Sequence, residues 1–401
     1  MRLRILHIVP YEKYVYTEIG LWDKLDVKNR YVSIEDIDDS IIVKDIDRIE
    51  KISSIDLTHI LQISDTYDVV VFSSLSAYMY PYVLRVPKEK IVIWQSVGYD
   101  IYSGYEPYVP IVSIPLYQPI TAQFIRPTQQ GLLPVVWKAL KQKIKQVVRN
   151  KKYLQQQNLN LVRKREQADA INRIDYVSTV LRPEYDLLKS NPLIRAKYFS
   201  FKYVVPCDAI NDYIVNFVET KYIQLGNSGD ETNNHLDVLN QIKQRNIISP
   251  LFVPMSYGGE TNYKEYVIKQ IGLQNPDSIV QAQYVERNLY IELLHRCRVG
   301  VFGHIRQQAL GNISLLMKQG CKVFLYKDSV AYKYFKELGA YVYSIEDDLS
   351  QEAIDTPLDE KQIAYNRSLF ENEYDNVLKA VEKDICQIKK IINTRTDNPI
   401  C

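Results

Sequence analysis

Cysteine and long apolar runs are both scarce in this sequence of 401 residues. The five cysteines form no C-x-x-C pair and no cluster with histidine, which argues against a zinc site and a disulfide framework. We therefore expect reduced thiols and a cytosolic protein. No run approaches the roughly 18 apolar residues of a membrane-spanning helix, and the first apolar run is too short for a signal peptide. Any membrane contact should therefore be peripheral.

Two glycine motifs of nucleotide-binding proteins are also missing. The first expected strand leads into Ile8-Val9-Pro10-Tyr11 rather than G-x-G-x-x-G, which argues against a dinucleotide-dependent dehydrogenase. No G-x-x-x-x-G-K-[ST] occurs, which disfavours a P-loop nucleotide hydrolase. D-x-D patterns at 36–38 and 45–47 lie in a run of alternating acids and isoleucines, and we expect no metal ion and no other cofactor. The net charge of +2 favours no class of partner.

Short apolar runs alternate with helical patterns along the chain. Residues 67–73 and 90–96 are nearly continuous apolar runs, typical of strands buried on both faces of a parallel sheet. Together with a run at 4–9 and a helical pattern at 55–64, they indicate a doubly wound sheet. A second series of strands is expected at 222–225, 251–254, 278–282, 299–303, 321–326 and 341–343. The sequence therefore predicts an α/β fold with two Rossmann-like domains.

Two domains are the natural division for a chain of this length. We place the first at 1–205, the second at 218–360 and an amphipathic helical tail at 361–401. Residues 98–134 are rich in Pro, Tyr and Gly and are expected to form a long loop. The carboxyl ends of the two sheets should face an interdomain cleft, where ligands of such folds bind.

Three polar turns containing glycine follow strands of the second predicted sheet, at 226–230, 253–260 and 304–312. Small residues let backbone amides approach an anion, and a helix start favours negative charge. The same residues are common in ordinary capped turns, and Arg306 fits either a diphosphate contact or a surface arginine beside a helix cap. Because the three turns share one edge of the sheet, together they indicate a phosphate site. The candidate residues are Gly226, Asn227, Ser228, Gly229, Asp230, Tyr257, Arg306, Gln307, Gln308, Gly311 and Asn312.

In the first predicted domain, the segment from Trp94 to Asp100 ends a strand. Asp100 would face the cleft there, as a general base or as a group that orients a hydroxyl. It equally fits a residue that only begins a turn. His7 lies within the first expected strand, where a histidine is more often a core residue than a functional one.

A basic stretch at about 134–165 has apolar residues at helical spacing. A basic amphipathic helix with an aromatic residue suits an anionic membrane surface. A solvated helix that packs one face on the core is the alternative, and no nucleic-acid-binding module accompanies the basic residues. We therefore expect no nucleic acid partner. The candidate membrane-contact residues are Trp137, Lys138, Lys141, Lys145 and Arg149.

In their order and spacing, these motifs resemble glycosyltransferase family 56. The resemblance rests on 226–230 followed by Asn233-x-His235, on 253–257, on Arg306-Gln-Gln-x-x-Gly311 and on 94–100. It implies a GT-B fold in which the first domain binds the acceptor and the second binds the nucleotide sugar, and His235 joins the candidate site on this ground. In GT-B proteins, a helical tail often crosses back to the first domain.

The resemblance also implies substrates. The donor would be a dTDP-activated 4-acetamido-4,6-dideoxyhexose, and the acceptor an oligosaccharide linked to a polyprenyl diphosphate. The enzyme would take part in bacterial surface polysaccharide synthesis, as in enterobacterial common antigen, and lie peripherally on the cytoplasmic face of the inner membrane. Two alternatives remain: a nucleotide-sugar epimerase with two similar domains, and a non-catalytic nucleotide-sugar-binding protein.

Overall fold

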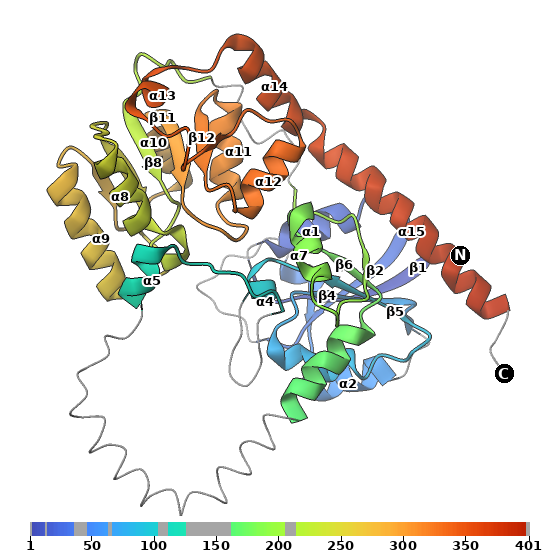
Figure 1. Cartoon of the computed structure of the whole chain (residues 1–401). Coiled ribbons are helices and arrows are strands. Elements are labelled where there is room, and N and C mark those ends of the chain that lie inside the picture. Colours follow the sequence, from blue (N-terminus) through green and yellow to red (C-terminus); the bar gives the residue numbers. More distant parts are fainter. Residues whose placement is uncertain are drawn as a thin grey trace, which may run out of the picture.

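The computed structural model describes residues 2–12, 14–35, 46–62, 66–102, 111–125, 162–204 and 214–397. Within them the chain forms two parallel sheets, one of seven strands and one of six, each with an apolar core on either face (Figure 1). The predicted α/β fold with two Rossmann-like domains is confirmed.

The first sheet has the strand order β3-β2-β1-β4-β5-β6-β7, and all neighbouring strands are parallel. β4 and β5 are buried throughout because apolar residues occupy both of their faces. β2 alternates exposed and half-buried residues over its first half, where it lies near the edge. The strands are β1 (Leu3–Ile8), β2 (Val27–Ser33), β3 (Ile49–Lys51), β4 (Val69–Ser73), β5 (Ile91–Gln95), β6 (Tyr176–Ser178) and β7 (Lys197–Tyr198).

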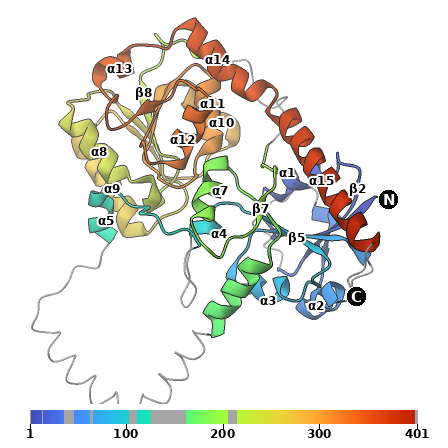
Figure 2. The same cartoon turned by 45° about the vertical axis from the view of Figure 1, so that its right-hand side comes forward.

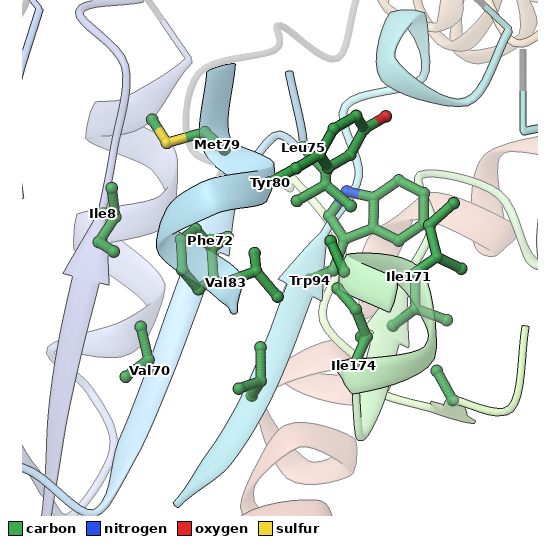
Figure 3. Packing of buried hydrophobic residues seen from close by; sticks show 14 of the residues in the cluster. Ile8, Val70, Phe72, Leu75, Met79, Tyr80, Val83, Trp94, Ile171 and Ile174 are labelled. Atoms are coloured by element: carbon green, nitrogen blue, oxygen red, sulfur yellow. The ribbon is translucent and has the colours of Figure 1, made fainter. Parts of the chain in front are cut away.

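Two apolar cores lie on opposite faces of the first sheet. In the core of Figure 3, Phe72 and Trp94 of the sheet pack with Met79 and Tyr80 and with a helix at 162–173. The other core lies under α1 and contains Trp22. The helices of this domain are α1 (Val15–Trp22), α2 (Ser54–Gln62), α3 (Tyr80–Val83), α4 (Tyr99–Tyr102) and α7 (Arg182–Lys189), with short 3-10 helices η1 (Ile46–Arg48) and η3 (Ala77–Met79).

The second sheet has the strand order β10-β9-β8-β11-β12-β13, again all parallel. Its strands are β8 (Tyr222–Leu225), β9 (Leu251–Pro254), β10 (Ile279–Gln281), β11 (Cys297–Phe302), β12 (Lys322–Leu325) and β13 (Tyr343–Ser344). The helical elements are η5 (Glu231–Asn233), α8 (His235–Gln244), α9 (Thr261–Gln274), α10 (Arg287–His295), α11 (Leu310–Lys318), α12 (Val330–Glu337), α13 (Gln351–Asp355) and α14 (Glu360–Glu371).

Two segments pack on the domain to which they are not adjacent in sequence (Figures 1 and 2). α5 (Pro119–Ile125) packs against α8 of the second domain. α15 (Glu373–Asp397) returns to the first domain, where Val381, Ile385 and Ile388 are buried in the core under α1. Among the described residues, no helix is both long and apolar enough to cross a membrane.

Candidate active site

The turn after β8 is held in shape by a buried asparagine. Asn233 accepts a hydrogen bond from the Asn227 backbone N–H at 3.2 Å, and its amide nitrogen donates to the carbonyl and hydroxyl oxygens of Ser228 at 3.2 and 3.1 Å. Gly226 has a φ of 64°, and a Cβ there would lie 2.9 Å from both the Asn233 amide oxygen and His235 Nε2. Both the conformation and the space therefore require glycine at this position.

The three predicted turns meet at the carboxyl edge of the second sheet. The Gly229 N–H donates to the Tyr257 carbonyl at 2.8 Å, and the Asn227 amide donates to the Tyr257 hydroxyl at 2.9 Å. Gln308 connects the third turn, because its amide donates to Asn227 Oδ1 at 3.1 Å and accepts from the Thr232 hydroxyl at 2.8 Å. Hydrogen bonds therefore join the three turns in one structure.

Asp230 caps the short helix η5 that follows the first turn. One of its carboxylate oxygens accepts a hydrogen bond from the Thr232 N–H at 2.9 Å and another from the Thr232 hydroxyl. Its exposure is intermediate, and Tyr117 of the segment 111–118 lies within its electrostatic reach. The carboxylate therefore orders the turn and keeps one edge open to the cleft.

Arg306 places a cation in the third turn. Its guanidinium lies 3.5 Å from the Thr232 hydroxyl, and among the described residues no carboxylate forms an ion pair with it. Its charge reaches the first domain: burial raises the pKa of Glu184 to about 7, and Arg306 acts against that rise. A half-buried guanidinium without a carboxylate partner is free to bind an anion.

The two domains approach closely beside Arg306. Gly98 of the first domain has a φ of 97°, and a Cβ there would lie 2.8 Å from the side-chain oxygen of Gln307. A cavity of about 860 Å³ also lies between the domains, lined among others by Leu187 of α7, Tyr117 and Ile305. Its volume is within the range of small-molecule sites. The third turn therefore borders an interdomain space.

Asp100 does not fit the expected role of general base. Its carboxylate is buried and accepts five hydrogen bonds, from the N–H groups of Leu75, Val97 and Gly98, the Trp94 indole at 2.7 Å and the Ser96 hydroxyl at 2.8 Å. A carboxylate offers about four lone-pair positions, so none is left for an acceptor hydroxyl. Burial raises its pKa, while these hydrogen bonds lower it. Asp100 instead fixes the loop that presents Gly98.

Two more predicted residues lie away from the open surface. His235 is fully buried beneath Gly226, and burial lowers its pKa to about 4, so the neutral ring supports the turn and cannot touch a diphosphate. Asn312 donates to the Tyr290 hydroxyl at 2.8 Å. Gly311, one residue earlier in α11, is exposed, with no atom within 4 Å of a Cβ placed there.

A polar edge of the first sheet was missed by the sequence analysis. Ser74 and Tyr99, which follow β4 and β5, share a hydrogen bond of 2.7 Å between their hydroxyl groups. Glu35, which follows β2, accepts from the Tyr78 hydroxyl and from the Tyr11 N–H at 3.1 Å. We call these five residues the first-domain rim. They lack glycine motifs, but each closely follows a strand, which is the signal that could have found them.

The predicted membrane contacts Trp137, Lys138, Lys141, Lys145 and Arg149 lie outside the described residues. Among the residues that are described, no three His, Cys, Asp or Glu side chains are grouped so that they could hold a metal ion.

Comparison with known families gives a match that spans the second domain. Residues 198–383 match the family model described as 4-alpha-L-fucosyltransferase glycosyl transferase group 56, which confirms the resemblance seen in the sequence. The match includes all three turns.

Solved structures with similar folds cover nearly the whole chain. A glycosyltransferase from Rickettsia africae has a TM-score of 0.57 at 12% identity, covering 98% of this chain and 99% of that one. HepE of Anabaena in complex with UDP has a TM-score of 0.54 at 10% identity, and the lipopolysaccharide outer core galactosyltransferase WaaB one of 0.51 at 8%, with 99% of both chains covered in each case. At such identities the likeness shows the fold alone, and it confirms the GT-B architecture.

Proposed function

We propose that this chain, a glycosyltransferase with the GT-B fold, moves a 4-acetamido-4,6-dideoxyhexose from a dTDP-sugar to an oligosaccharide linked to a polyprenyl diphosphate. The observation that carries the proposal is the joined set of three turns with Arg306 at the edge of the second sheet, where Gln307 of the third turn lies against Gly98 of the first domain.

The donor diphosphate would lie between Arg306 and the first turn of α11. The first N–H groups of a helix have no partner within the helix, and Gly311 leaves open space beside them. The start of α8 is unsuited to the same task, because the His235 N–H already donates to the Tyr263 hydroxyl at 3.2 Å. Negative charge grows on the diphosphate as the sugar departs, and fixed donors with Arg306 stabilise that charge.

The acceptor would lie on the first-domain rim. The exposed Tyr78 and Tyr99 and the carboxylate of Glu35 can hydrogen-bond a sugar. Gly98 holds this domain against Gln307 of the other. Closure of the domains around the donor would also limit the access of water, which would otherwise hydrolyse it. Because HepE was solved in complex with UDP and with UDP-glucose, a nucleotide sugar is a reasonable donor for this fold. The basic stretch at 134–165 would hold the enzyme on the anionic cytoplasmic leaflet of the bacterial inner membrane.

A thermal-shift screen of dTDP, UDP, GDP and their sugars, followed by a transfer assay on polyprenyl-diphosphate saccharides, tests the proposal. We expect selective stabilisation by dTDP compounds, because a ligand that binds only the folded state raises its stability. Stabilisation by UDP alone would refute the dTDP assignment but not glycosyl transfer. Conversion of the donor without any acceptor would instead indicate an epimerase, and tight binding without turnover a binding protein.

Arg306→Ala provides the residue-level test. Loss of a charge-assisted contact of roughly 1.5–3 kcal/mol should weaken donor binding by about 10- to 150-fold in calorimetry. Lys243→Ala, which removes an exposed cation at the other end of α8, is the control and should leave donor affinity unchanged. An unchanged affinity in Arg306→Ala would remove this residue from the site.

A further inference from the structure

A polar groove runs between α2 and the turn formed by η3 and α3, on the outside of the first domain. Its volume is about 490 Å³. Figure 3 shows why the groove has an aromatic wall: Met79, Tyr80 and Val83 point into the core. Tyr78, which precedes them, and Tyr82, which lies between Tyr80 and Val83, line the groove from the outer side.

The lining has the chemistry of a carbohydrate site. Tyr78 and Tyr82 offer aromatic rings for the C–H faces of sugars, while Gln62 and His59 offer planar hydrogen-bonding groups for sugar hydroxyls. Arg85 is held in place, because its guanidinium donates to the Pro81 carbonyl at 2.6 Å and lies over the Tyr82 ring. Among the described residues, no carboxylate lines the groove, so they would not repel an anionic substituent on a sugar.

The groove continues from the first-domain rim. The Tyr78 hydroxyl donates to Glu35 of the rim, and the Tyr78 ring lines the groove. Ser76, which lies between Ser74 and Tyr78 in sequence, also shares a hydrogen bond of 3.2 Å with the Tyr99 hydroxyl of the rim. A saccharide whose terminal sugar lies at the rim would therefore pass over Tyr78, and its preceding sugars would enter the groove.

We propose that this groove binds the saccharide chain of the acceptor, so that the enzyme recognises an acceptor of two or more sugars rather than a single sugar. The proposal rests on the proposed function, because it places the acceptor at the rim. The Tyr82 ring offers an apolar face on which the C–H face of a sugar can stack. Loss of the Tyr82 ring should therefore weaken saccharide binding about tenfold.

The test uses the full chain on an array of lipid-free bacterial di- to hexasaccharides. We expect the wild type to bind a subset of these glycans, Tyr82→Ala and Gln62→Ala to bind the same subset about tenfold more weakly, and Tyr82→Phe, which keeps the ring, to bind as the wild type does. No glycan bound by the wild type, or equal binding by Tyr82→Ala and Gln62→Ala, would overturn the proposal.

Donor binding separates this proposal from the proposed function. Tyr82→Ala should keep the thermal shift given by the nucleotide, which also shows that the variant is folded. Arg306→Ala should lose that shift and keep glycan binding. Glycan binding that depends on Tyr82, in a protein that no nucleotide stabilises, would support the groove and contradict the transferase assignment.

Discussion

Replacement of Asn234 by alanine tests how the first half of the chain is fastened to the second domain. The Asn234 side chain is fully buried. Its oxygen accepts from the Gln118 N–H at 2.8 Å, while its nitrogen donates to the carbonyls of Gly303 at 2.8 Å, Leu116 at 3.1 Å and Thr232 at 3.2 Å. One amide thus connects two turns of the candidate site with the segment 111–118. The backbone of Asn234 is also left-handed, with a φ of 52°.

Two costs add in Asn234→Ala. Buried groups left without a hydrogen-bond partner cost about 1–3 kcal/mol each, and at least Gln118 N–H and one carbonyl would lose theirs. Alanine in a left-handed conformation costs roughly 1–2 kcal/mol more. We therefore expect a loss of about 3–8 kcal/mol in the free energy that holds residues 116–121 on the second domain.

Asn246→Ala is the matched control. Asn246 has nearly the same backbone conformation, with a φ of 54°, but its side chain is exposed. Its replacement should lower the stability only by the cost of placing alanine in a left-handed conformation, roughly 1–2 kcal/mol, and should not affect the segment 111–125. Asn234→Gly removes the side-chain hydrogen bonds, but glycine adopts the left-handed conformation without strain. Its loss of stability should therefore lie between those of Asn246→Ala and Asn234→Ala.

Hydrogen exchange resolved by mass spectrometry measures the effect directly. The amides of Gln118, Ile120 and Thr121 should exchange at least about 100-fold faster in Asn234→Ala than in the wild type, and at the wild-type rate in Asn246→Ala. If Asn234→Ala and Asn246→Ala exchange alike at 118–121, the argument that this side chain holds the segment is refuted.

Three further predictions concern the cleft, the pH response and Asp100. Gly98→Ala should lower the transferase activity even at temperatures where the variant is fully folded, because the new methyl group must displace Gln307 of the other domain. Unchanged activity would show that the close approach of Gly98 and Gln307 is not needed for transfer. Acid should affect the domains oppositely. The folded-state pKa of His235 is about 4, below its unfolded value near 6.5, so stability present above pH 6.5 falls by about 3 kcal/mol as the pH drops to 4. The folded-state pKa of Glu184 is about 7, so the first domain instead loses stability as the pH rises from 4.5 to 7. Hydrogen exchange measured separately for each domain at pH 4.5 and 7 tests both trends, and equal trends in the two domains would refute them. Asp100→Asn should lower the melting temperature, because the new NH₂ group would face N–H donors and could not accept their hydrogen bonds. A normal melting temperature together with a strongly reduced kcat would instead indicate that Asp100 is the general base.

Burial pattern decides which strands the sequence predicts. The apolar runs at 67–73 and 90–96 led to β4 and β5, because a strand buried on both faces is apolar throughout. β2 escaped prediction, because Val27–Ser33 alternates exposed polar residues over its first half. β7 has only two residues at the edge of the sheet, too few for any periodic signal.

The part of the candidate site that lies in the second domain was predictable, because its turns directly follow neighbouring strands of one parallel sheet. Turns after neighbouring parallel strands must share an edge, and the hydrogen bonds of Asn227 and Gln308 show the three together. The role of Asp100 was not predictable, since an aspartate at the start of a short helix looks the same in sequence whether its partners are water or five buried donors. The packing of 111–125 on α8 depends on contacts more than a hundred residues apart, which no local pattern encodes.

The exchange of segments between the halves has a consequence for attempts to dissect the protein. Both carboxylate oxygens of Asp237 in α8 accept N–H groups from the start of α5, at 2.8 and 2.9 Å. An excised second domain would leave that carboxylate without these donors, and an excised first domain would lose the apolar side chains that α15 brings to it. No single cut of the polypeptide therefore yields two self-sufficient fragments. Expression of halves should give aggregation-prone material, and functional dissection of this enzyme depends on point substitutions in the intact chain.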